Sequence, residues 1–191
     1  MILFSYQGDN LMKSKIAVFT LLASTITSGY SINTLAQTCY DATGFVSTEN
    51  MTSTLQIGEI SLELSDQSGL EFSETGSLAG NITGGGSDVL AYLSHTARFS
   101  QGDSFVTNGD AAVLDVSVEN GFNPVRDFYF DDNGVPVACS FWVKENISDI
   151  IRGTRFFQNV VSVHVTAQGY ISNCPNENLN YFELSGELCT E

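Results

Sequence analysis

The sequence predicts an all-β domain, a single antiparallel β-barrel of about eight strands, with a β-sandwich as the alternative. The first observation behind this prediction is the alternation of apolar and polar residues in 137–144, 161–168 and 181–188. A period of two residues is typical of a strand that buries one face and exposes the other. The second observation is that no segment has the helical period of about 3.6 residues.

The N-terminal 36 residues have the features of a secretory leader. Two lysines precede the apolar run 16–23, and small residues lead to a small-x-small cleavage motif that ends at Ala36. An aspartate lies ahead of both lysines, which makes Met12 an alternative start of translation. The apolar run is shorter than the roughly 20 residues of a membrane-spanning helix. We therefore predict a signal peptide over 1–36, a secreted domain over 37–191, and no membrane span in the mature chain.

Charge and cysteine content restrict the partners of this domain. The chain carries 22 Asp and Glu against 7 Lys and Arg, a net charge of −15. Such a surface repels polyanions, so nucleic acid is not expected as a partner. The four cysteines all follow the leader, and an even number in a secreted domain predicts two disulfides. No Cys-x-x-Cys occurs and the chain has 2 histidines, so we predict neither a metal site nor a cofactor.

The first half of the domain is predicted to form three strands. The mixed stretch 39–54 contains the first, and the alternation in 59–65 marks the second. A polar turn leads to the extended segment 70–83, which glycines interrupt at Gly76 and Gly80. Glycine inside a strand is typical of bulges or tight curvature, and we expect one of these two features at each position.

A hairpin with its turn at Gln101-Gly102 is predicted to follow. Its strands are 89–99 and 105–118, both with apolar residues at alternate positions. The second strand contains Asn108-Gly109, a dipeptide that is typical of tight turns. Because alternation resumes after it, we interpret this dipeptide as a bulge within one continuous strand.

Two later segments allow alternative interpretations. The sequence Asp-Asp-Asn-Gly at 131–134 predicts a hairpin turn, and its oxygen-rich side chains leave a calcium loop as the alternative. The segment 146–153 is predicted to be a strand, with two helical turns as the alternative.

Two groups of residues resemble a known family. They are Ser-His-Thr-Ala-Arg-Phe at 94–99 with Gly-Asp-Ser-Phe-Val-Thr at 102–107, and Ile-Ile-Arg-Gly-Thr-Arg-Phe at 150–156. This pattern is similar to secreted bacterial relatives of the allene oxide cyclase and dirigent barrels. Arg155 stands where that family usually has a second glycine. The resemblance implies an eight-stranded antiparallel barrel with an apolar interior, and it carries little information on activity.

The barrel topology selects one of the three possible disulfide connectivities. In an up-and-down barrel the first strand lies beside the last, which brings Cys39 to Cys189. The remaining pair, Cys139 and Cys174, then lies near the other end of the barrel.

A candidate site is predicted on the hairpin. Antiparallel pairing around Gln101-Gly102 sets His95 opposite Asn108 or Gly109, with Asp110 as a neighbour. Both side chains belong to rows predicted to face inward, which continue to Leu114. A carboxylate beside an imidazole orients it and raises its basicity, as a general base requires; the alternative is a pair that only stabilises the hairpin. The predicted ligand contacts are Leu93, Phe99, Phe105 and Phe141.

Three functions follow from these patterns, in this order. The first is non-catalytic binding of a small apolar ligand in the barrel interior. The second is an extracellular interaction or carbohydrate-binding module, with Trp142 as a platform that Tyr129 or Tyr170 extends. The third, implied by the resemblance together with His95 and Asp110, is an enzyme of the cyclase or isomerase type. The sequence does not predict the oligomeric state.

Overall fold

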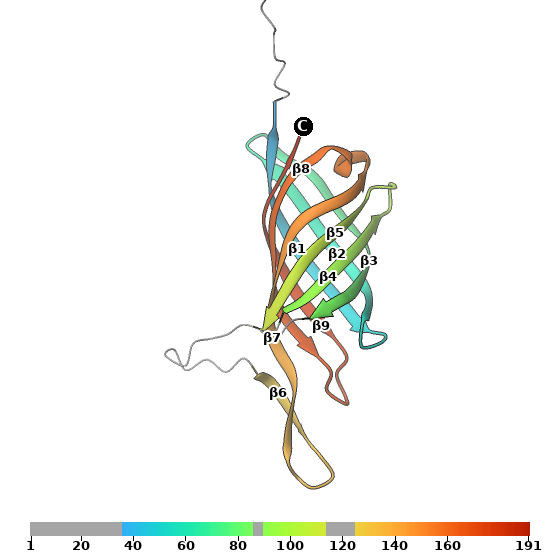
Figure 1. Cartoon of the computed structure of the whole chain (residues 1–191). Helices are drawn as coiled ribbons and strands as arrows, with labels where there is room; N and C mark the ends of the chain where they lie inside the picture. The colour runs from blue at the N-terminus through green and yellow to red at the C-terminus, as the bar shows by residue number, and fades with distance from the viewer. Residues whose placement is uncertain (1–35, 86–89, 114–124) are drawn as a thin grey trace, which may run out of the picture. The chain divides into compact units, whose positions relative to one another are not determined.

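The computed structural model describes residues 36–85, 90–113 and 125–191. These residues form nine antiparallel strands, eight of which close a barrel (Figure 1). The strands are β1 (Thr38–Asn50), β2 (Leu55–Asp66), β3 (Gly69–Gly85), β4 (Leu90–Phe99), β5 (Ser104–Val113), β6 (Val125–Phe130), β7 (Pro136–Thr154), β8 (Val160–Ser172) and β9 (Asn180–Thr190). Around the barrel the order is β1, β2, β3, β4, β5, β7, β8, β9, and β9 pairs with β1. The predicted all-β barrel is confirmed.

The extra strand, β6, continues the sheet beyond the point where β5 ends. Residues 143–154 of β7 pair with β5, and residues 136–141 of β7 pair with β6. Figure 1 shows this β6–β7 hairpin extending past the end of the barrel. The predicted signal peptide before Ala36, and the predicted strand residues from Leu114 onward, lie outside the described residues.

Alternating side chains fill the barrel as the sequence pattern predicts. Inward-facing residues on each strand are buried, and each large apolar side chain contributes roughly 1.5–3 kcal/mol by leaving water. The buried aliphatic residues of the barrel include Val46, Ile60, Leu62, Leu64, Leu78, Leu93, Val143, Val163, Val165, Leu184 and Leu188.

An aromatic cluster closes one end of the barrel. The 3₁₀ helix η2 (Arg155–Asn159) joins β7 to β8 and places Phe157, 1% exposed, in this cluster. Its ring centroid lies 5.2 Å from that of Phe72, 5.9 Å from Phe99 and 4.9 Å from Phe105. Packing of this kind makes Phe157 the plug of that end.

The turn before Phe157 restricts two residues, Arg155 by its backbone conformation and Gly153 by lack of space. Arg155 has φ 52°, a left-handed conformation that glycine adopts readily and that costs other residues roughly 1–2 kcal/mol. Gly153, two residues earlier, has no room for a side chain, since a Cβ there would overlap the carbonyl of Phe157.

Both predicted disulfides are present. Cys39 and Cys189 lie opposite each other on β1 and β9, and Cys139 on β7 is bonded to Cys174 in the loop after β8. The two bonds therefore lie at opposite ends of the barrel, as the topology requires.

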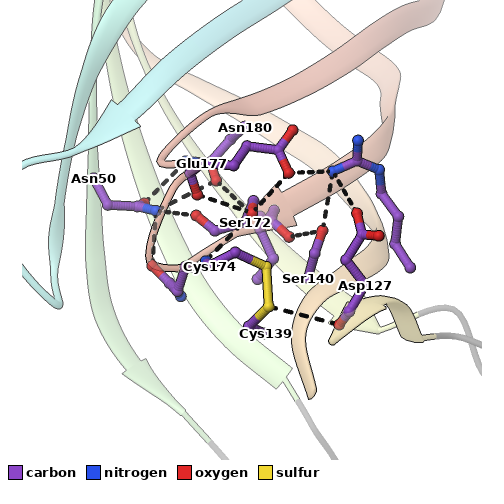
Figure 2. The surroundings of a disulfide bond; sticks show 11 residues. Asn50, Asp127, Cys139, Ser140, Ser172, Cys174, Glu177 and Asn180 are labelled. Carbon is purple, nitrogen blue, oxygen red and sulfur yellow. Dashed lines mark hydrogen bonds and ion pairs between the residues drawn. A yellow bond between two sulfur atoms is a disulfide. The ribbon is translucent and has the colours of Figure 1, made fainter. Parts of the chain in front are cut away.

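Hydrogen bonds and ion pairs surround the Cys139–Cys174 disulfide (Figure 2). Glu177 forms an ion pair with Arg126 at 2.9 Å and accepts a hydrogen bond from the hydroxyl of Ser172 at 3.3 Å. The pKa of Glu177 is lowered by its hydrogen bond to the guanidinium. These contacts attach the loop and β6 to the barrel body.

Gly76 and Gly80 do not form bulges, which were one of the two features predicted at these positions. Gly76 and Gly80 pair regularly; they leave room for neighbours, since a Cβ on Gly76 would lie 2.5 Å from the Arg98 carbonyl oxygen. A bulge near the start of β8 instead turns Val161 outward, where it is 46% exposed rather than in the predicted inward row. The segment 146–153 is part of β7, so the strand prediction there is confirmed over the helical alternative.

Among the described residues, the structure has no helix that is both long and apolar enough to cross a membrane.

Candidate functional site

A cavity lies in the barrel interior, and all eight barrel strands line it. The space open to the centre of a water-sized sphere is about 50 Å³, and by that measure one water needs roughly 10–15 Å³. On β1 the lining extends from Ala42 to Thr48, about 20 Å along a strand that rises about 3.3 Å per residue. A space of this volume holds a few waters or part of a small molecule.

Most of the cavity wall is apolar. Its apolar side chains belong to the buried core described above. Its polar side chains come from β1, β2, β4, β5 and β7, one from each strand. The polar lining residues are Thr48, Gln56, His95, Thr107 and Glu145. An apolar pocket with a few convergent polar groups is the usual form of a small-molecule site.

His95 and Thr107 face each other across the β4–β5 pair. Thr107 is 2% exposed, and its hydroxyl has no hydrogen-bond partner among the described residues. Leaving a buried hydroxyl unpaired costs roughly 1–3 kcal/mol, so such groups are rare and need an explanation. Thr107 is one of the residues that line the cavity.

Glu145 is the carboxylate that lies nearest to His95. The distance from His95 Nε2 to Glu145 Oε2 is 3.8 Å, which is too long for a hydrogen bond. Burial raises the pKa of Glu145 from 4.5 to about 7 and lowers the pKa of His95 from 6.5 to about 4. Both shifts have the same cause, since removal from water disfavours the charged form of each group. The pair is therefore neutral between about pH 4 and pH 7, and an ion pair is disfavoured.

The neighbouring polar residues are fixed by a hydrogen-bond network at the end of the barrel opposite the aromatic plug. Gln56 donates to Asn50 Oδ1 at 3.2 Å, and Asn180 donates to the same oxygen at 2.9 Å. Asn180 also donates to the Thr48 hydroxyl at 3.2 Å. Gly80 leaves space here, because a Cβ would lie 3.0 Å from His95 Cδ2 and 3.3 Å from Gln56 Oε1.

The structure does not bring the predicted pair His95 and Asp110 together. Asp110 lies opposite Tyr92 on the outer face, and its carboxylate accepts a hydrogen bond from Asn146 Nδ2 at 3.3 Å. The prediction was wrong because it placed a bulge in β5 at Asn108-Gly109. The two register shifts between β5 and β7 have their additional residues on β7, so β5 alternates without interruption and Asp110 faces outward.

The four predicted ligand contacts have different positions. Phe105 lines the cavity. Phe99 is buried in the aromatic plug, where its ring centroid lies 5.2 Å from that of Phe72. Leu93 is buried and Phe141 half-buried in the core, but neither lines the cavity.

Sequence reasoning missed Glu145, although a signal for it existed. The alternation of 137–144 places Cys139, Phe141 and Val143 on one face, and continuing it by two residues places Glu145 on the same inward face. A charged residue in an apolar row is the exception that marks a candidate site.

Two other predicted features lie away from the cavity. Asp131 Oδ1 accepts hydrogen bonds from the amides of Asn133 at 2.9 Å and Val135 at 2.8 Å, so segment 131–134 forms the predicted hairpin turn. Trp142 lies on the outer face with its ring centroid 5.8 Å from that of Tyr170, whereas Tyr129 lies on β6.

Within the described part of the chain, one group of metal-type ligands is close together, Cys39, Glu187 and Cys189. Its two sulfurs are joined in a disulfide and are not available as thiolate ligands.

Comparison of the chain with protein-family models, with curated proteins and with solved structures found no match. The resemblance to the allene oxide cyclase and dirigent barrels stays a prediction that depends on the motifs at 94–107 and 150–156.

Proposed function

We propose that this protein binds a small, mainly apolar molecule that carries one neutral hydrogen-bonding group. The observation that carries the proposal is a mainly apolar cavity whose polar lining residues include His95, Glu145 and Thr107, a residue with an unpaired buried hydroxyl. An eight-stranded barrel is wide enough to be filled by its own side chains or to hold one small ligand. The cavity and the unpaired hydroxyl favour the second arrangement.

The electrostatics of the cavity define the class of ligand. An ionised ligand would lose its hydration on entry, and the cavity offers no opposite charge between about pH 4 and pH 7. A hydroxyl or carbonyl group can instead pair with Thr107 and with neutral His95 or Glu145. A straight-chain alcohol represents this chemistry.

The experiment compares octanol, octanoic acid and octylamine by calorimetric titration at pH 5.5 and pH 8, after native mass spectrometry has tested for a molecule retained from expression. Octanol is expected to bind at both values. Octanoic acid is expected to lose affinity at pH 8, where Glu145 and the ligand both carry negative charge. Absence of a retained molecule together with failure of all three compounds to bind would refute the proposal.

Matched variants test whether binding occurs in the cavity. Leu62→Phe adds volume to the lining and is expected to abolish octanol binding. Asp110→Asn changes an outward-facing carboxylate of the same hairpin and is expected to leave binding unchanged. Equal losses in both variants would place the binding outside the cavity.

A second candidate is acid–base catalysis on the bound molecule. Glu145 favours it, because a pKa of about 7 allows the carboxyl group both to accept and to donate a proton near neutral pH. Deuterium incorporation from heavy water into a retained ligand, lost in Glu145→Gln, is the expected result. Incorporation that is equal with and without protein would exclude this candidate.

The cellular location is part of the proposal. Two disulfides are typical of proteins from an oxidising compartment. We infer export through the leader 1–36, which N-terminal sequencing of the exported protein tests. A mature chain that begins at Gln37 is expected, and an uncleaved chain confined to the cytoplasm would refute the inference.

A further inference from the structure

The outer face of the barrel carries a row of aromatic side chains across four neighbouring strands. Trp142 on β7, Tyr170 on β8 and Tyr181 on β9 are directly opposite one another in register, and Phe45 on β1 follows diagonally. The successive ring centroids are 5.8, 6.4 and 6.2 Å apart. The solvent-facing side of such a strand is normally polar, so a continuous aromatic row there is unusual.

The rings of the row differ in how far other side chains cover them. The guanidinium of Arg126 lies 3.9 Å from the Tyr170 ring centroid and covers a face of that ring. Tyr181 and Phe45 have no such cover among the described residues, and Phe45 is 40% exposed. Their ring planes differ by 19°, so the two rings are nearly parallel. The open part of the row is therefore the Tyr181–Phe45 pair.

A depression in the surface adjoins this open pair. It is lined by both rings, by hydroxyl and carboxylate side chains, and by Gly44. The polar lining residues are Thr43, Ser61, Glu63 and Glu183. Glu63 accepts a hydrogen bond from Ser73 at 3.4 Å, whereas the carboxylate of Glu183 has no hydrogen bond or ion pair to another described residue.

A second row of polar residues lies parallel to the aromatic row. Lys144 lies opposite Gln168, Gln168 lies opposite Glu183, and Glu183 lies opposite Phe45. Lys144, Gln168 and Glu183 are all exposed, and their side chains make no hydrogen bond to other described residues. They supply donors and acceptors beside the rings.

We propose that this surface, the Tyr181–Phe45 platform with its depression and polar row, binds a neutral polysaccharide. Sugar rings present C–H groups on their faces, which pack on aromatic rings, and hydroxyl groups at their edges, which hydrogen-bond to carboxylate and amide side chains. Both kinds of contact are available here side by side. The net charge of −15 opposes an anionic polymer and also opposes association of two copies of the chain.

The test is affinity gel electrophoresis of the full mature domain in gels that contain xyloglucan, laminarin or hydroxyethyl cellulose, with heparin as the anionic comparison. Retardation by at least one neutral polymer and none by heparin is expected. Tyr181→Ala and Glu183→Gln are each expected to weaken this binding roughly three- to tenfold. Tyr92→Ala removes an aromatic ring that is 55% exposed on β4, outside the row, and is expected to leave binding unchanged.

Three outcomes would overturn the proposal. The first is absence of retardation by all three neutral polymers. The second is unchanged binding in both Tyr181→Ala and Glu183→Gln, with circular dichroism showing both folded. The third is a dimer on size-exclusion chromatography that Tyr181→Ala dissociates, because that result assigns the platform to self-association. Octanol binding in the cavity is independent of all three, so this proposal and the ligand proposal fail separately.

Discussion

Replacing Glu145 by Gln is expected to change how the stability of the barrel depends on pH. In the folded protein the pKa of Glu145 is about 7, against 4.5 for the exposed carboxyl of the unfolded chain. Below pH 4.5 the carboxyl is protonated in both states, and the raised pKa has no cost. As the pH rises from 4.5 to 7, the unfolded state ionises first, and the folded state loses stability relative to it.

The size of the effect follows from the shift. A difference of about 2.5 pH units corresponds to about 3 kcal/mol, which the folded state loses fully by pH 8. His95 acts in the opposite direction, because its lowered pKa makes the folded state lose stability as the pH falls from 6.5 to about 4. The two windows overlap, so the two slopes largely cancel in the unmodified protein. In Glu145→Gln the pH dependence that comes from Glu145 is absent, so the opposite pH dependence that comes from His95 is no longer cancelled.

The assay is urea unfolding of the parent protein, Glu145→Gln and His95→Gln at several values between pH 4 and pH 8. The free energy of unfolding of Glu145→Gln, relative to the parent, is expected to rise by about 3 kcal/mol from pH 4 to pH 8. For His95→Gln the corresponding difference is expected to rise as the pH falls. A difference for Glu145→Gln that is flat over this range, or that falls with rising pH, would refute a neutral buried carboxyl.

Four further predictions follow from named contacts. Thr107→Val removes the unpaired hydroxyl and is expected to raise stability by about 1 kcal/mol while lowering octanol affinity; a loss of stability in urea would contradict an unpaired group. Phe157→Ala empties the aromatic plug and is expected to cost about 3–5 kcal/mol in urea unfolding, and a cost under about 1 kcal/mol would exclude a plug. Arg155→Gly relieves the left-handed conformation, and calorimetry should show a melting temperature that is unchanged or higher rather than lower. Replacing both Cys139 and Cys174 by Ser is expected to cost about 4 kcal/mol for a loop of 35 residues, measured in urea, and no cost would show that the disulfide does not restrict the unfolded chain.

Alternation was sufficient to predict antiparallel strands, and an up-and-down barrel topology was sufficient to predict the disulfides. A period of two residues fixes which side chains point inward, and closure of an up-and-down barrel fixes which strands are neighbours. The pairing of Cys39 with Cys189 follows from the second rule alone, because β1 and β9 lie side by side in any such barrel. Neither rule depends on the details of side-chain packing, which explains why both succeeded without a structure.

Bulges limited the prediction of the candidate site. One additional residue in a strand reverses which side chains face inward beyond it. The sequence marks Asn108-Gly109 as irregular but does not show which of two paired strands holds the additional residue. Because the bulges are on β7, β5 alternates regularly and Asp110 faces outward. On β7 the bulges change which residues face inward: Val143 and Glu145 do so before them, and Ile150 lines the cavity after the first of them. The orientation of Asp110 therefore depends on whether β5 or its partner strand β7 contains the bulges, which the sequence of β5 does not show.

The polar groups in the cavity are costly for a fold of this size. Burial raises the pKa of Glu145 to about 7 and lowers the pKa of His95 to about 4, and both changes cost stability near the ordinary pKa of each group. The unpaired Thr107 hydroxyl adds roughly 1–3 kcal/mol. Single domains are stable by only about 5–15 kcal/mol, so these terms are a large fraction of the total. Apolar residues of the same volume would avoid them, and the aromatic plug and the network around Asn180 already fix the barrel at its two ends. The cost of burying these three groups therefore supports the proposal that a molecule in the cavity pairs with them.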